Sequence, residues 1–393
     1  MKKWMKQYIM ALVAVFLIGN GWMTIASAEE KIPGLQEGTL SAIMIEQKTG
    51  KVLYEYEPNK QLPPASMTKI MTMLLVMEAL EEGKITLEDK VIASERAASM
   101  GGSQIFLEEG EEMTVDELLK GVAIASGNDA SVALAEYIEG SVEEFVEKMN
   151  ERAEALGLKH TTFKNPTGLP EEGHVTTAHD LAVMSQALLE YEDILNYTKI
   201  YDDYLRKGKE NEFWLVNTNR LVKFYDGVDG LKTGYTKEAK YNLTATAKRG
   251  NMRVITVLMG ADTPKERNKK TTDMLDFAFQ RYEYQMIHEE NEVMGEVAIE
   301  KGRKTKVPAV LKDTVGIVIP KGKNVENVSS EITWKKDLIA PLKKGTVVGT
   351  VTFMDGENKL VEEELILQED AAPANWFVLF KRTLSSFMGD LRV

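Results

Sequence analysis

The stretch Ala65-Ser66-Met67-Thr68-Lys69 opens the segment "ASMTKIMTMLLVMEALEEG", which runs to Gly83 and decides the fold. After Ser66 the segment is apolar on almost every face of a helix, and it stops near Gly83, a residue type that commonly ends helices. Because a helix that is apolar all round must be covered on all sides, the segment predicts a helix buried at the centre of a domain.

The sequence around this helix mixes strand and helix patterns. Residues 41–47 and 51–57 alternate as two strands, joined near the turn Lys48-Thr49-Gly50. Residues 115–141 read as a helix, a break at Ser126-Gly127-Asn128 and a second helix. A capping-box-like start at Thr177 opens another helix, and residues 241–261 read as a hairpin of two strands. These patterns predict an α+β domain.

Residues 1–28 have the features of a secretory signal peptide. Three lysines precede an apolar run, and Ala26-Ser27-Ala28 resembles the small-residue pattern at a cleavage site. An uncleaved N-terminal membrane helix is the alternative, although glycines interrupt the apolar run. Either way, the sequence predicts export of the remainder.

Composition excludes several functional classes. Without residues 1–28 the formal charge moves from −13 to −16, and such an acidic chain is a poor partner for nucleic acid. The chain has no cysteine, which excludes cysteine nucleophiles and thiolate metal sites. Its four histidines form no H-E-x-x-H motif and no i, i+4 pair, so we expect no metal and no cofactor.

The chain changes character towards its C-terminus. We expect the first domain at residues 29–290 and a small β-rich domain at 291–370, where apolar and polar residues alternate between turns. Residues 371–393 predict an amphipathic helix in the plane of a membrane interface, since Lys381 and Arg382 leave no uninterrupted apolar run long enough to span a bilayer while the apolar residues share one face. The alternative is a helix that packs on the β domain. The residues on its apolar face are Trp376, Phe377, Phe380, Leu384, Phe387, Met388 and Leu391.

Ser66 and Lys69 form a Ser-x-x-Lys pair at the start of the buried helix. Residues i and i+3 share a helix face, so the lysine amine can lie near the serine hydroxyl. Serine is a weak nucleophile without a neighbouring base, and lysine serves as a base only where burial or another cation lowers its pKa. The pair is a weak signal alone, because Ser-x-x-Lys also arises by chance.

Two further motifs follow in the chain. Ser126-Gly127-Asn128 lies at the helix break, and Lys232-Thr233-Gly234 precedes Tyr235 and a strand-rich segment. Lys-Thr-Gly also occurs at 48–50, but that copy precedes Ser66 and lies between two strand patterns, which predicts a turn. The order Ser-x-x-Lys, Ser-x-Asn, Lys-Thr-Gly is the signature of penicillin-binding proteins and serine β-lactamases.

With these motifs the chain resembles the low-molecular-mass penicillin-binding proteins, specifically the serine D-alanyl-D-alanine carboxypeptidases. The stretches "GVAIASGNDASVALAE", "NPTGLPEEGHVTTAHDLA" and "DGLKTGYTKEAKYNLTATA" are similar to that family, as is the layout of a catalytic domain, a β domain and a tail. The resemblance implies a penicillin-binding-protein/β-lactamase-like α+β domain, an antiparallel sheet flanked by helices. It also implies a location at the outer face of the bacterial cytoplasmic membrane.

The resemblance further implies a role for each motif residue. Ser66 would attack the carbonyl between the two D-alanines of a peptidoglycan stem peptide, and Lys69 would be its base. Ser126, with Lys232 nearby, would relay a proton to the leaving D-alanine, and Asn128 would orient Lys69 or the substrate. The N–H groups of Ser66 and Tyr235 would bind the oxyanion. The expected contacts to the terminal carboxylate are Lys232, Thr233 with Gly234, and Arg267 in the charge-rich segment after the hairpin.

The resemblance also implies that β-lactam antibiotics acylate the enzyme. Some family members carry histidine where this chain has Tyr235, so local substrate preference can differ. A β-lactamase stays open as an alternative, because Glu171 and Glu172 lie in a loop comparable to that of the deacylating glutamate in class A enzymes. A non-catalytic wall-binding protein of the same fold and an endopeptidase acting on cross-links are further alternatives.

Overall fold

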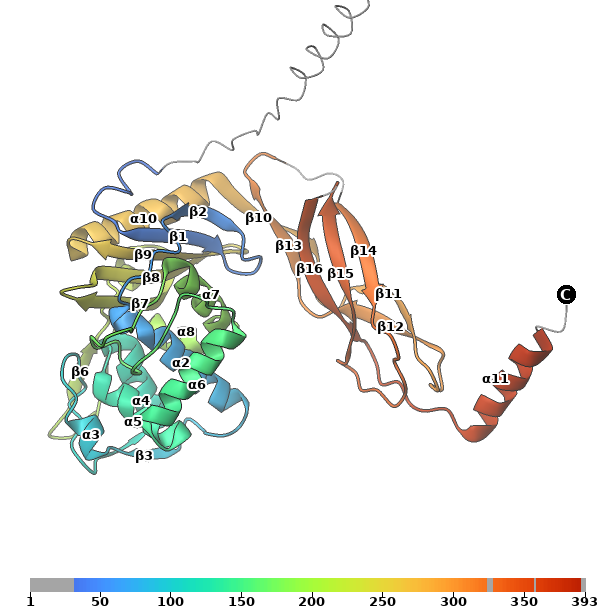
Figure 1. Cartoon of the computed structure of the whole chain (residues 1–393), viewed down its shortest axis with the longest axis horizontal. Coiled ribbons are helices and arrows are strands. Elements are labelled where there is room, and N and C mark those ends of the chain that lie inside the picture. Colours follow the sequence, from blue (N-terminus) through green and yellow to red (C-terminus); the bar gives the residue numbers. More distant parts are fainter. Residues whose placement is uncertain (1–31, 324–327, 357, 390–393) are drawn as a thin grey trace, which may run out of the picture. The chain divides into compact units, whose positions relative to one another are not determined.

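The structure is a computed structural model, and it describes residues 32–323, 328–356 and 358–389 (Figure 1). The chain divides into two units, Met1–Pro33 and Gly34–Val393, and the second contains the elements named in the following paragraphs. The predicted signal peptide, residues 1–28, lies outside the described residues.

An antiparallel sheet organises the first region of the chain. Helix α10 (Pro264–Arg281) covers one face of it and α7 (Ala178–Leu188) packs on the other (Figure 1). Because both faces are covered, β9 is buried along its whole length, and no face of it needs polar side chains. The five strands, in order across the sheet, are β2 (Val52–Tyr56), β1 (Ser41–Glu46), β9 (Met252–Ala261), β8 (Lys240–Arg249) and β7 (Val228–Thr236).

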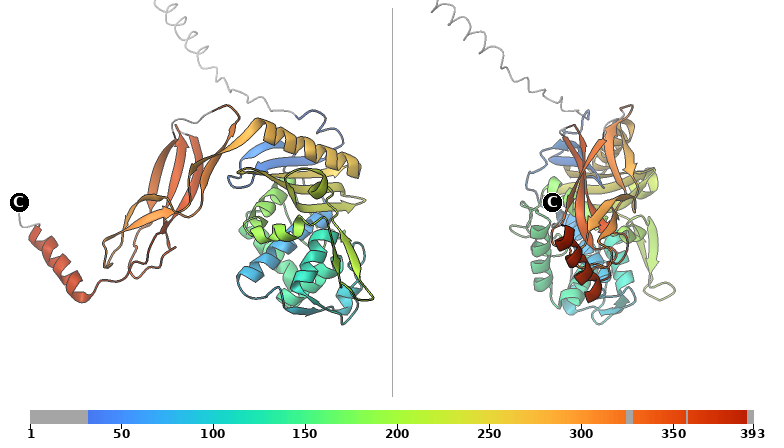
Figure 2. Two further views of the ribbon diagram at one scale, coloured as in Figure 1. Left: turned by 180° about the vertical axis from the view of Figure 1, so that it is seen from behind. Right: turned by 90° about the vertical axis from the view of Figure 1, so that its right-hand side faces the viewer.

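A helical layer lies on the α7 side of this sheet, as the front view and the view from behind both show (Figures 1 and 2). The predicted buried helix begins with a 3₁₀ turn, η1 (Ala65–Thr68), and continues as α2 (Lys69–Glu81). The predicted helix break is also present, between the π-helical turn η2 (Gly121–Ala125) and α5 (Asn128–Glu139). The remaining helices of this region are α3 (Glu95–Ala98), α4 (Val115–Lys120), α6 (Val142–Ala155), η3 (Glu192–Ile194), α8 (Leu195–Thr198) and α9 (Leu221–Phe224).

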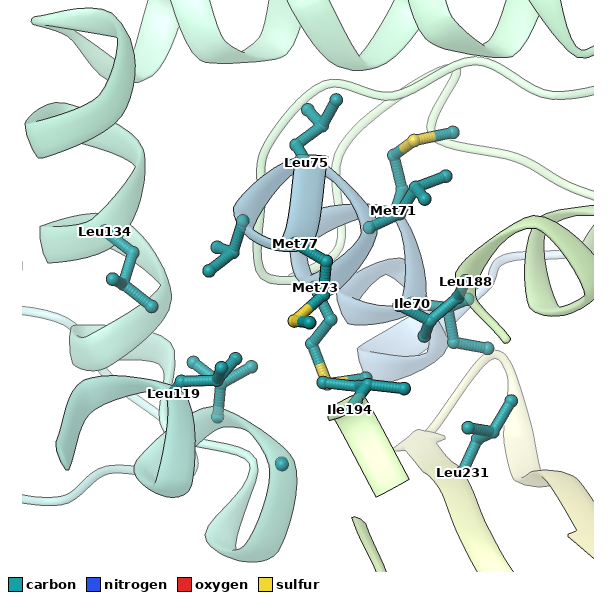
Figure 3. Packing of buried hydrophobic residues seen from close by; sticks show 14 of the residues in the cluster. Ile70, Met71, Met73, Leu75, Met77, Leu119, Leu134, Leu188, Ile194 and Leu231 are labelled. Atoms are coloured by element: carbon teal, nitrogen blue, oxygen red, sulfur yellow. The ribbon is translucent and has the colours of Figure 1, made fainter. Parts of the chain in front are cut away.

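Helix α2 is the centre of the hydrophobic core. Every side chain from Met67 to Met77 is buried, including that of Lys69. Figure 3 shows the apolar side chains of α2 between those of α5, α7 and β7, with Leu134, Leu188 and Leu231 among their neighbours. The helix that the all-round apolar pattern predicted is therefore observed, enclosed by other elements.

Two short strand pairs complete the first region. Strand β3 (Lys90–Ile92) pairs with β4 (Glu112–Thr114), and β5 (Asp202–Leu205) pairs with β6 (Phe213–Val216). Strands of three and four residues leave too short a pattern to be predicted from alternation.

The C-terminal part is built of strands, as its alternating sequence predicts. Strand β10 (Tyr282–His288) pairs with β13 (Val315–Pro320), so residues from 282 already belong to this β structure. The last described element is helix α11 (Trp376–Gly389). Of the predicted apolar face, Leu391 and the side chains of Leu384, Phe387 and Met388 lie outside what the structure describes. The second sheet has the order β11 (Val293–Ala298), β12 (Lys306–Leu311), β16 (Asn358–Leu367), β15 (Val347–Asp355) and β14 (Val328–Trp334).

Gly168 allows the loop at 163–175 to reach the start of the buried helix. Its φ is +85°, and a Cβ atom placed on it would lie 1.8 Å from the carbonyl oxygen of Ala65. No side chain fits at that distance, so the loop and η1 approach as closely as they do only because residue 168 is glycine.

Alanine at a positive φ costs about 1–2 kcal/mol for its backbone conformation alone. We predict that Gly168→Ala lowers the free energy of unfolding by that amount and by about 2 kcal/mol or more in addition, because of the steric clash. Gly140→Ala is the matched control, since Gly140 has φ +83° and nothing within 4 Å of the added Cβ. Thermal unfolding followed by circular dichroism measures both variants. Equal losses of melting temperature would contradict the steric argument.

Candidate active site

Three chain segments bring the predicted motif residues together. Ser66 and Lys69 come from η1 and the start of α2, Ser126 and Asn128 from the break before α5, and Lys232 from β7. Lys69 Nζ lies 3.3 Å from Ser66 Oγ and 2.6 Å from Asn128 Oδ1. The i, i+3 spacing of serine and lysine therefore places the amine beside the hydroxyl, as the sequence predicts.

Lys69 is fully buried, and its amine donates to two uncharged oxygens. The acceptors are Asn128 Oδ1 and, at 2.7 Å, the backbone carbonyl oxygen of Thr167. Burial and, after it, the nearby charge of Lys232 hold the pKa of Lys69 well below its usual range, while Asp129 opposes this shift. Asp129 is itself buried, and its carboxylate accepts hydrogen bonds from the backbone N–H groups of Ile105 and Leu107. A lysine in this environment favours its neutral form.

The helix break exposes the Ser126 hydroxyl to the site. After the π-helical turn, Ser126 has φ +65°, in the left-handed region that residues other than glycine seldom adopt. Its side chain is only 3% exposed, and among the described residues its Oγ has no hydrogen-bond partner. Such turns and such φ values are concentrated at functional sites. A buried hydroxyl without a partner is costly unless a ligand satisfies it.

Asn128 is fixed at both ends of its amide. Its Oδ1 accepts from Lys69, and its Nδ2 donates to the backbone oxygen of Gly101 at 2.7 Å. The resemblance leaves two roles open for Asn128, orienting Lys69 or orienting the substrate. In the structure its amide oxygen contacts Lys69.

Strand β7 packs directly on η1, and Gly234 makes this possible. A Cβ atom on Gly234 would lie 2.9 Å from the carbonyl oxygen of Pro64 and 3.2 Å from Ala65 Cβ. Packing therefore explains why Lys-Thr-Gly ends in glycine, because a larger residue would push the strand away from Ser66. The other copy of the tripeptide is a turn between β1 and β2, where Gly50 has φ +65°.

Lys232 is the second buried cation of the site. It is 1% exposed, its Nζ donates to the carbonyl oxygen of Thr233 at 3.0 Å, and burial together with the charge of Arg267 lowers its pKa to about 7. Arg267 lies on helix α10 rather than in a loop and is only 7% exposed, with burial lowering its pKa to about 10. Arg267 is thus a buried cation facing another, which favours an anionic ligand nearby.

Six of the predicted site residues line an open cleft of about 480 Å³, whereas the buried side chains of Lys69, Asn128 and Lys232 are not among its lining residues. At its edge, the exposed ring of Tyr235 stacks on Tyr241 with a centroid distance of 4.3 Å. The cleft brings together residues from η1, the helix break, β7 and α10, as the motif order predicts. Its predicted lining residues are Ser66, Ser126, Thr233, Gly234, Tyr235 and Arg267.

Two groups in the site were not predicted from the sequence. Thr218 lines the cleft, and its hydroxyl accepts a hydrogen bond of 2.8 Å from Thr233 Oγ1, but it belongs to no recognisable motif. Thr167 contributes only a backbone oxygen, which no side-chain pattern can reveal. Only the stretch 165–182, quoted above for its resemblance, points to this loop.

Comparison with known proteins agrees with this geometry. The profile of a family described as D-alanyl-D-alanine carboxypeptidase matches residues 27–263. A second profile, the C-terminal domain of penicillin-binding protein 5, matches residues 282–372.

Relatives cover nearly the whole chain. D-alanyl-D-alanine carboxypeptidase DacF of Bacillus subtilis is 53% identical over 382 residues, which cover 96% of this chain and 98% of the relative. Penicillin-binding protein 5 of Haemophilus influenzae has a similar structure, with a TM-score of 0.69 and 33% identity over 85% of this chain and 98% of its own. The ampicillin-bound penicillin-binding protein D2 of Listeria monocytogenes matches with a TM-score of 0.55 and 31% identity, over 63% of this chain and 100% of its own.

The expected α+β fold, with a penicillin-binding-protein-like domain followed by a β domain, is thereby confirmed. The matched residues 27–263 include Ser66, Lys69, Ser126 and Lys232, with the buried Lys69 amine beside the Ser66 hydroxyl, while Arg267 lies just beyond them. The chain belongs to the serine D-alanyl-D-alanine carboxypeptidases of the low-molecular-mass penicillin-binding protein family.

Proposed function

We propose that this carboxypeptidase removes the terminal D-alanine of peptidoglycan stem peptides through an acyl-enzyme on Ser66. The observation that carries the assignment is the 3.3 Å separation of Lys69 Nζ and Ser66 Oγ, with two other acceptors already on the amine. A neutral amine has two N–H groups, and these donate to Asn128 Oδ1 and to the Thr167 carbonyl oxygen. The lone pair of the amine is then free to accept the hydroxyl proton of Ser66. Lys69 is then the general base for acylation.

The proposed reaction has two stages. Ser66 Oγ forms a bond to the carbonyl carbon as its proton passes to Lys69 Nζ. The C–N bond then breaks, and the leaving amine takes a proton through Ser126, whose hydroxyl has no other partner among the described residues. Water later cleaves the ester and restores Ser66.

Two backbone N–H groups are proposed to bind the oxyanion, those of Ser66 and Tyr235. The close packing of Gly234 on Pro64 and Ala65 supports this pairing, because it brings the strand that carries Tyr235 directly against the turn that carries Ser66. A donor of this kind is commonly worth about 2.7–4 kcal/mol in the transition state.

The terminal carboxylate of the substrate is proposed to bind Thr233, Lys232 and Arg267. Burial lowers the pKa of both cations, and the charge of Arg267 lowers that of Lys232 further, so a bound anion would favour the charged form of each. Thr218, whose hydroxyl contacts Thr233, completes this end of the cleft. The same contacts suit the carboxylate of a penicillin, so we propose that β-lactams acylate Ser66.

The position of Glu171 favours a carboxypeptidase over a β-lactamase. Glu171 is exposed and accepts a hydrogen bond from Asn165 Nδ2 at 3.1 Å. Together with Glu172 it lines a separate hollow of about 470 Å³, and Ser66 is not among the described residues that line that hollow. A glutamate placed there is not positioned to activate water at an ester on Ser66.

Helix α11 is proposed to bind the membrane surface after export directed by residues 1–28. No helix within the described residues is long and apolar enough to span a membrane. Trp376, Phe377 and Phe380 are 74%, 67% and 51% exposed, and Trp376 stacks on Phe380. Arg382 donates to the carbonyl oxygens of Gly302 and Arg303 and leaves these aromatic rings uncovered. Aromatic rings on one face of a helix suit a bilayer interface.

Members of the penicillin-binding protein family act on peptidoglycan outside the cytoplasmic membrane. We therefore propose the outer face of that membrane as the location. We also propose the expected layout of a catalytic domain (29–290), a β domain (291–370) and an anchoring helix (371–393), with the first boundary moved to about residue 282 because β10 pairs with β13.

Replacing Ser66 by alanine should abolish both covalent labelling by a fluorescent penicillin and release of D-alanine from a synthetic pentapeptide. The variant loses the only group that forms the ester, so we expect activity at the uncatalysed background. Ser103→Ala, a change at another serine that lines the cleft, is the control and should retain labelling. Release of D-alanine by the Ser66 variant would refute the mechanism.

The lifetime of the penicillin adduct separates the proposed function from its alternative. We expect the wild-type acyl-enzyme to persist long after free penicillin is removed, because no carboxylate is positioned to activate water at Ser66. Intact-protein mass spectrometry measures the decay. Rapid, repeated turnover of penicillin would identify a β-lactamase instead.

The pH profile of kcat/KM should rise as Lys69 loses its proton and fall above about pH 7 as Lys232 loses its own. Arg267→Gln removes a neighbouring positive charge, so it should raise the pKa of Lys232 and shift the alkaline limb upward by about half a unit to one unit. Arg267→Lys retains the charge and should leave the limb in place, although both variants bind substrate less well. An unshifted limb in Arg267→Gln would show that Lys232 does not control it.

Changing Trp376, Phe377 and Phe380 together to serine should reduce binding of the full chain to anionic phospholipid vesicles by more than about tenfold, since each ring contributes about 1.5–3 kcal/mol when buried. Phe224→Ser is the matched control, because Phe224 is 69% exposed but lies outside the tail. Vesicle sedimentation measures the bound fraction. Unchanged binding of the triple variant would exclude the aromatic face as the anchor.

A further inference from the structure

His174 is a buried histidine that the mechanism above does not use. It lies at the end of the loop 163–175, is 4% exposed, and packs edge-on against the ring of Phe163. Its Nε2 lies 2.9 Å from Thr68 Oγ1, and its Nδ1 lies 3.4 Å from the backbone nitrogen of Lys164. Thr68 stands between Ser66 and Lys69, so the histidine contacts the 3₁₀ turn that carries the nucleophile.

The direction of each hydrogen bond follows from the donors available. Thr68 Oγ1 lies 2.9 Å from the carbonyl oxygen of Ala65, which can only accept, so the single hydroxyl hydrogen of Thr68 is used there. The contact between His174 and Thr68 must then be an Nε2–H donating to the hydroxyl oxygen. The Lys164 N–H donates to Nδ1. His174 is therefore the neutral Nε2–H tautomer, and the bonds run in one direction from Lys164 to Ala65.

This chain of hydrogen bonds ends at the peptide group between Ala65 and Ser66. The carbonyl of Ala65 and the N–H of Ser66 belong to the same planar peptide unit. A hydrogen bond accepted by that oxygen polarises the unit and strengthens its N–H as a donor, by roughly 10–30% per bond in condensed-phase estimates. The hydrogen bond also fixes the orientation of this peptide plane. Ala65, whose carbonyl belongs to the plane, has φ +49°, in the left-handed region. Gly168 leaves the space in which this carbonyl lies.

We propose that His174 is a positioning residue which, through Thr68, orients and polarises the Ala65–Ser66 peptide so that the Ser66 N–H stabilises the oxyanion. The inference rests on the proposed function, because it takes the Ser66 N–H as an oxyanion donor. His174 does not touch the substrate or Lys69. Its part is to hold the donor in the geometry that the transition state requires.

The surroundings of His174 keep the relay intact at neutral pH. Burial lowers the pKa of its imidazole to about 4, and the two charged groups that act on it oppose each other, Glu171 raising the pKa and Lys164 lowering it. Protonation of Nδ1 would end the hydrogen bond from the Lys164 N–H. Because the imidazole stays neutral far above that pKa, this relay adds no limb to the pH profile near pH 7.

The experiment compares His174→Ala, His174→Gln, Thr68→Val and the double variant His174→Ala with Thr68→Val in the full chain. We measure the second-order rate of acylation by a fluorescent penicillin, together with kcat and KM for D-alanine release. We expect His174→Ala to lower acylation and kcat by about tenfold to a hundredfold, with KM changed less than twofold, since one oxyanion donor is weakened rather than removed. Glutamine at 174 keeps an N–H donor in place of Nε2–H and should recover activity to within about threefold.

The double variant and a matched control distinguish positioning from stability. If His174 acts through Thr68, the double variant should be no slower than Thr68→Val alone, because both changes interrupt one chain. Thr72→Val is the control: Thr72 lies one helical turn after Thr68, and its Oγ1 donates to the Pro166 carbonyl oxygen in the same loop. It should lower the melting temperature without a comparable loss of acylation.

Several outcomes would overturn the inference. These are wild-type acylation by His174→Ala, losses that multiply in the double variant, or an equal loss of acylation in Thr72→Val. If His174→Ala does not fold, Thr68→Ser against Thr68→Val decides, since only the former keeps the hydroxyl, and equal acylation by the two would refute the relay. Ser66→Ala, assayed in parallel, separates the two levels: if it is inactive while His174→Ala is normal, only the relay fails, and if it is active, the proposed function itself fails.

Discussion

The burial of one amine, that of Lys69, is the constraint on which the rest of the structure depends. An ammonium group enclosed by the α2 core is expensive unless it loses its proton or finds a counter-charge. Within the described residues no carboxylate is hydrogen-bonded to it, and its partners are the Asn128 amide oxygen, the Thr167 backbone carbonyl and the Ser66 hydroxyl. The apolar helix that holds the domain together therefore also prepares the base, so that stability and chemistry have the same origin.

The position of that amine depends on three close backbone approaches. Loop 163–175 reaches η1 because residue 168 lacks a side chain, and β7 reaches it because residue 234 does. The break before α5 brings in Asn128 through a left-handed Ser126. The groups that these approaches place against η1 and Lys69 are backbone or amide groups. Strand β7 also carries Lys232, whose charge favours the neutral form of Lys69.

Much of this could be predicted from the sequence, because short motifs and periodicities record local requirements. The buried helix, the helix break and the hairpin were predictable, and so were the motif side chains that surround Ser66. The contributions of Thr167 and Thr218 were not, since one is a backbone oxygen and the other a hydroxyl outside any motif. The location of Arg267 on a helix, nearly buried, was also beyond prediction, because it depends on how α10 covers the sheet. What escapes prediction is the tertiary approach of segments distant in the sequence.

The backbone oxygen that accepts from Lys69 has an evolutionary consequence. A point mutation at position 167 changes a side chain but leaves the carbonyl in place, so the base cannot lose this partner by a single substitution there. Only changes that redirect the main chain, such as those at neighbouring glycine or proline positions, can reach it. Under selection by an antibiotic that mimics the substrate, most point mutations would therefore leave this contact unchanged. Resistance mutations that act on the base would have to change the backbone conformation of the loop.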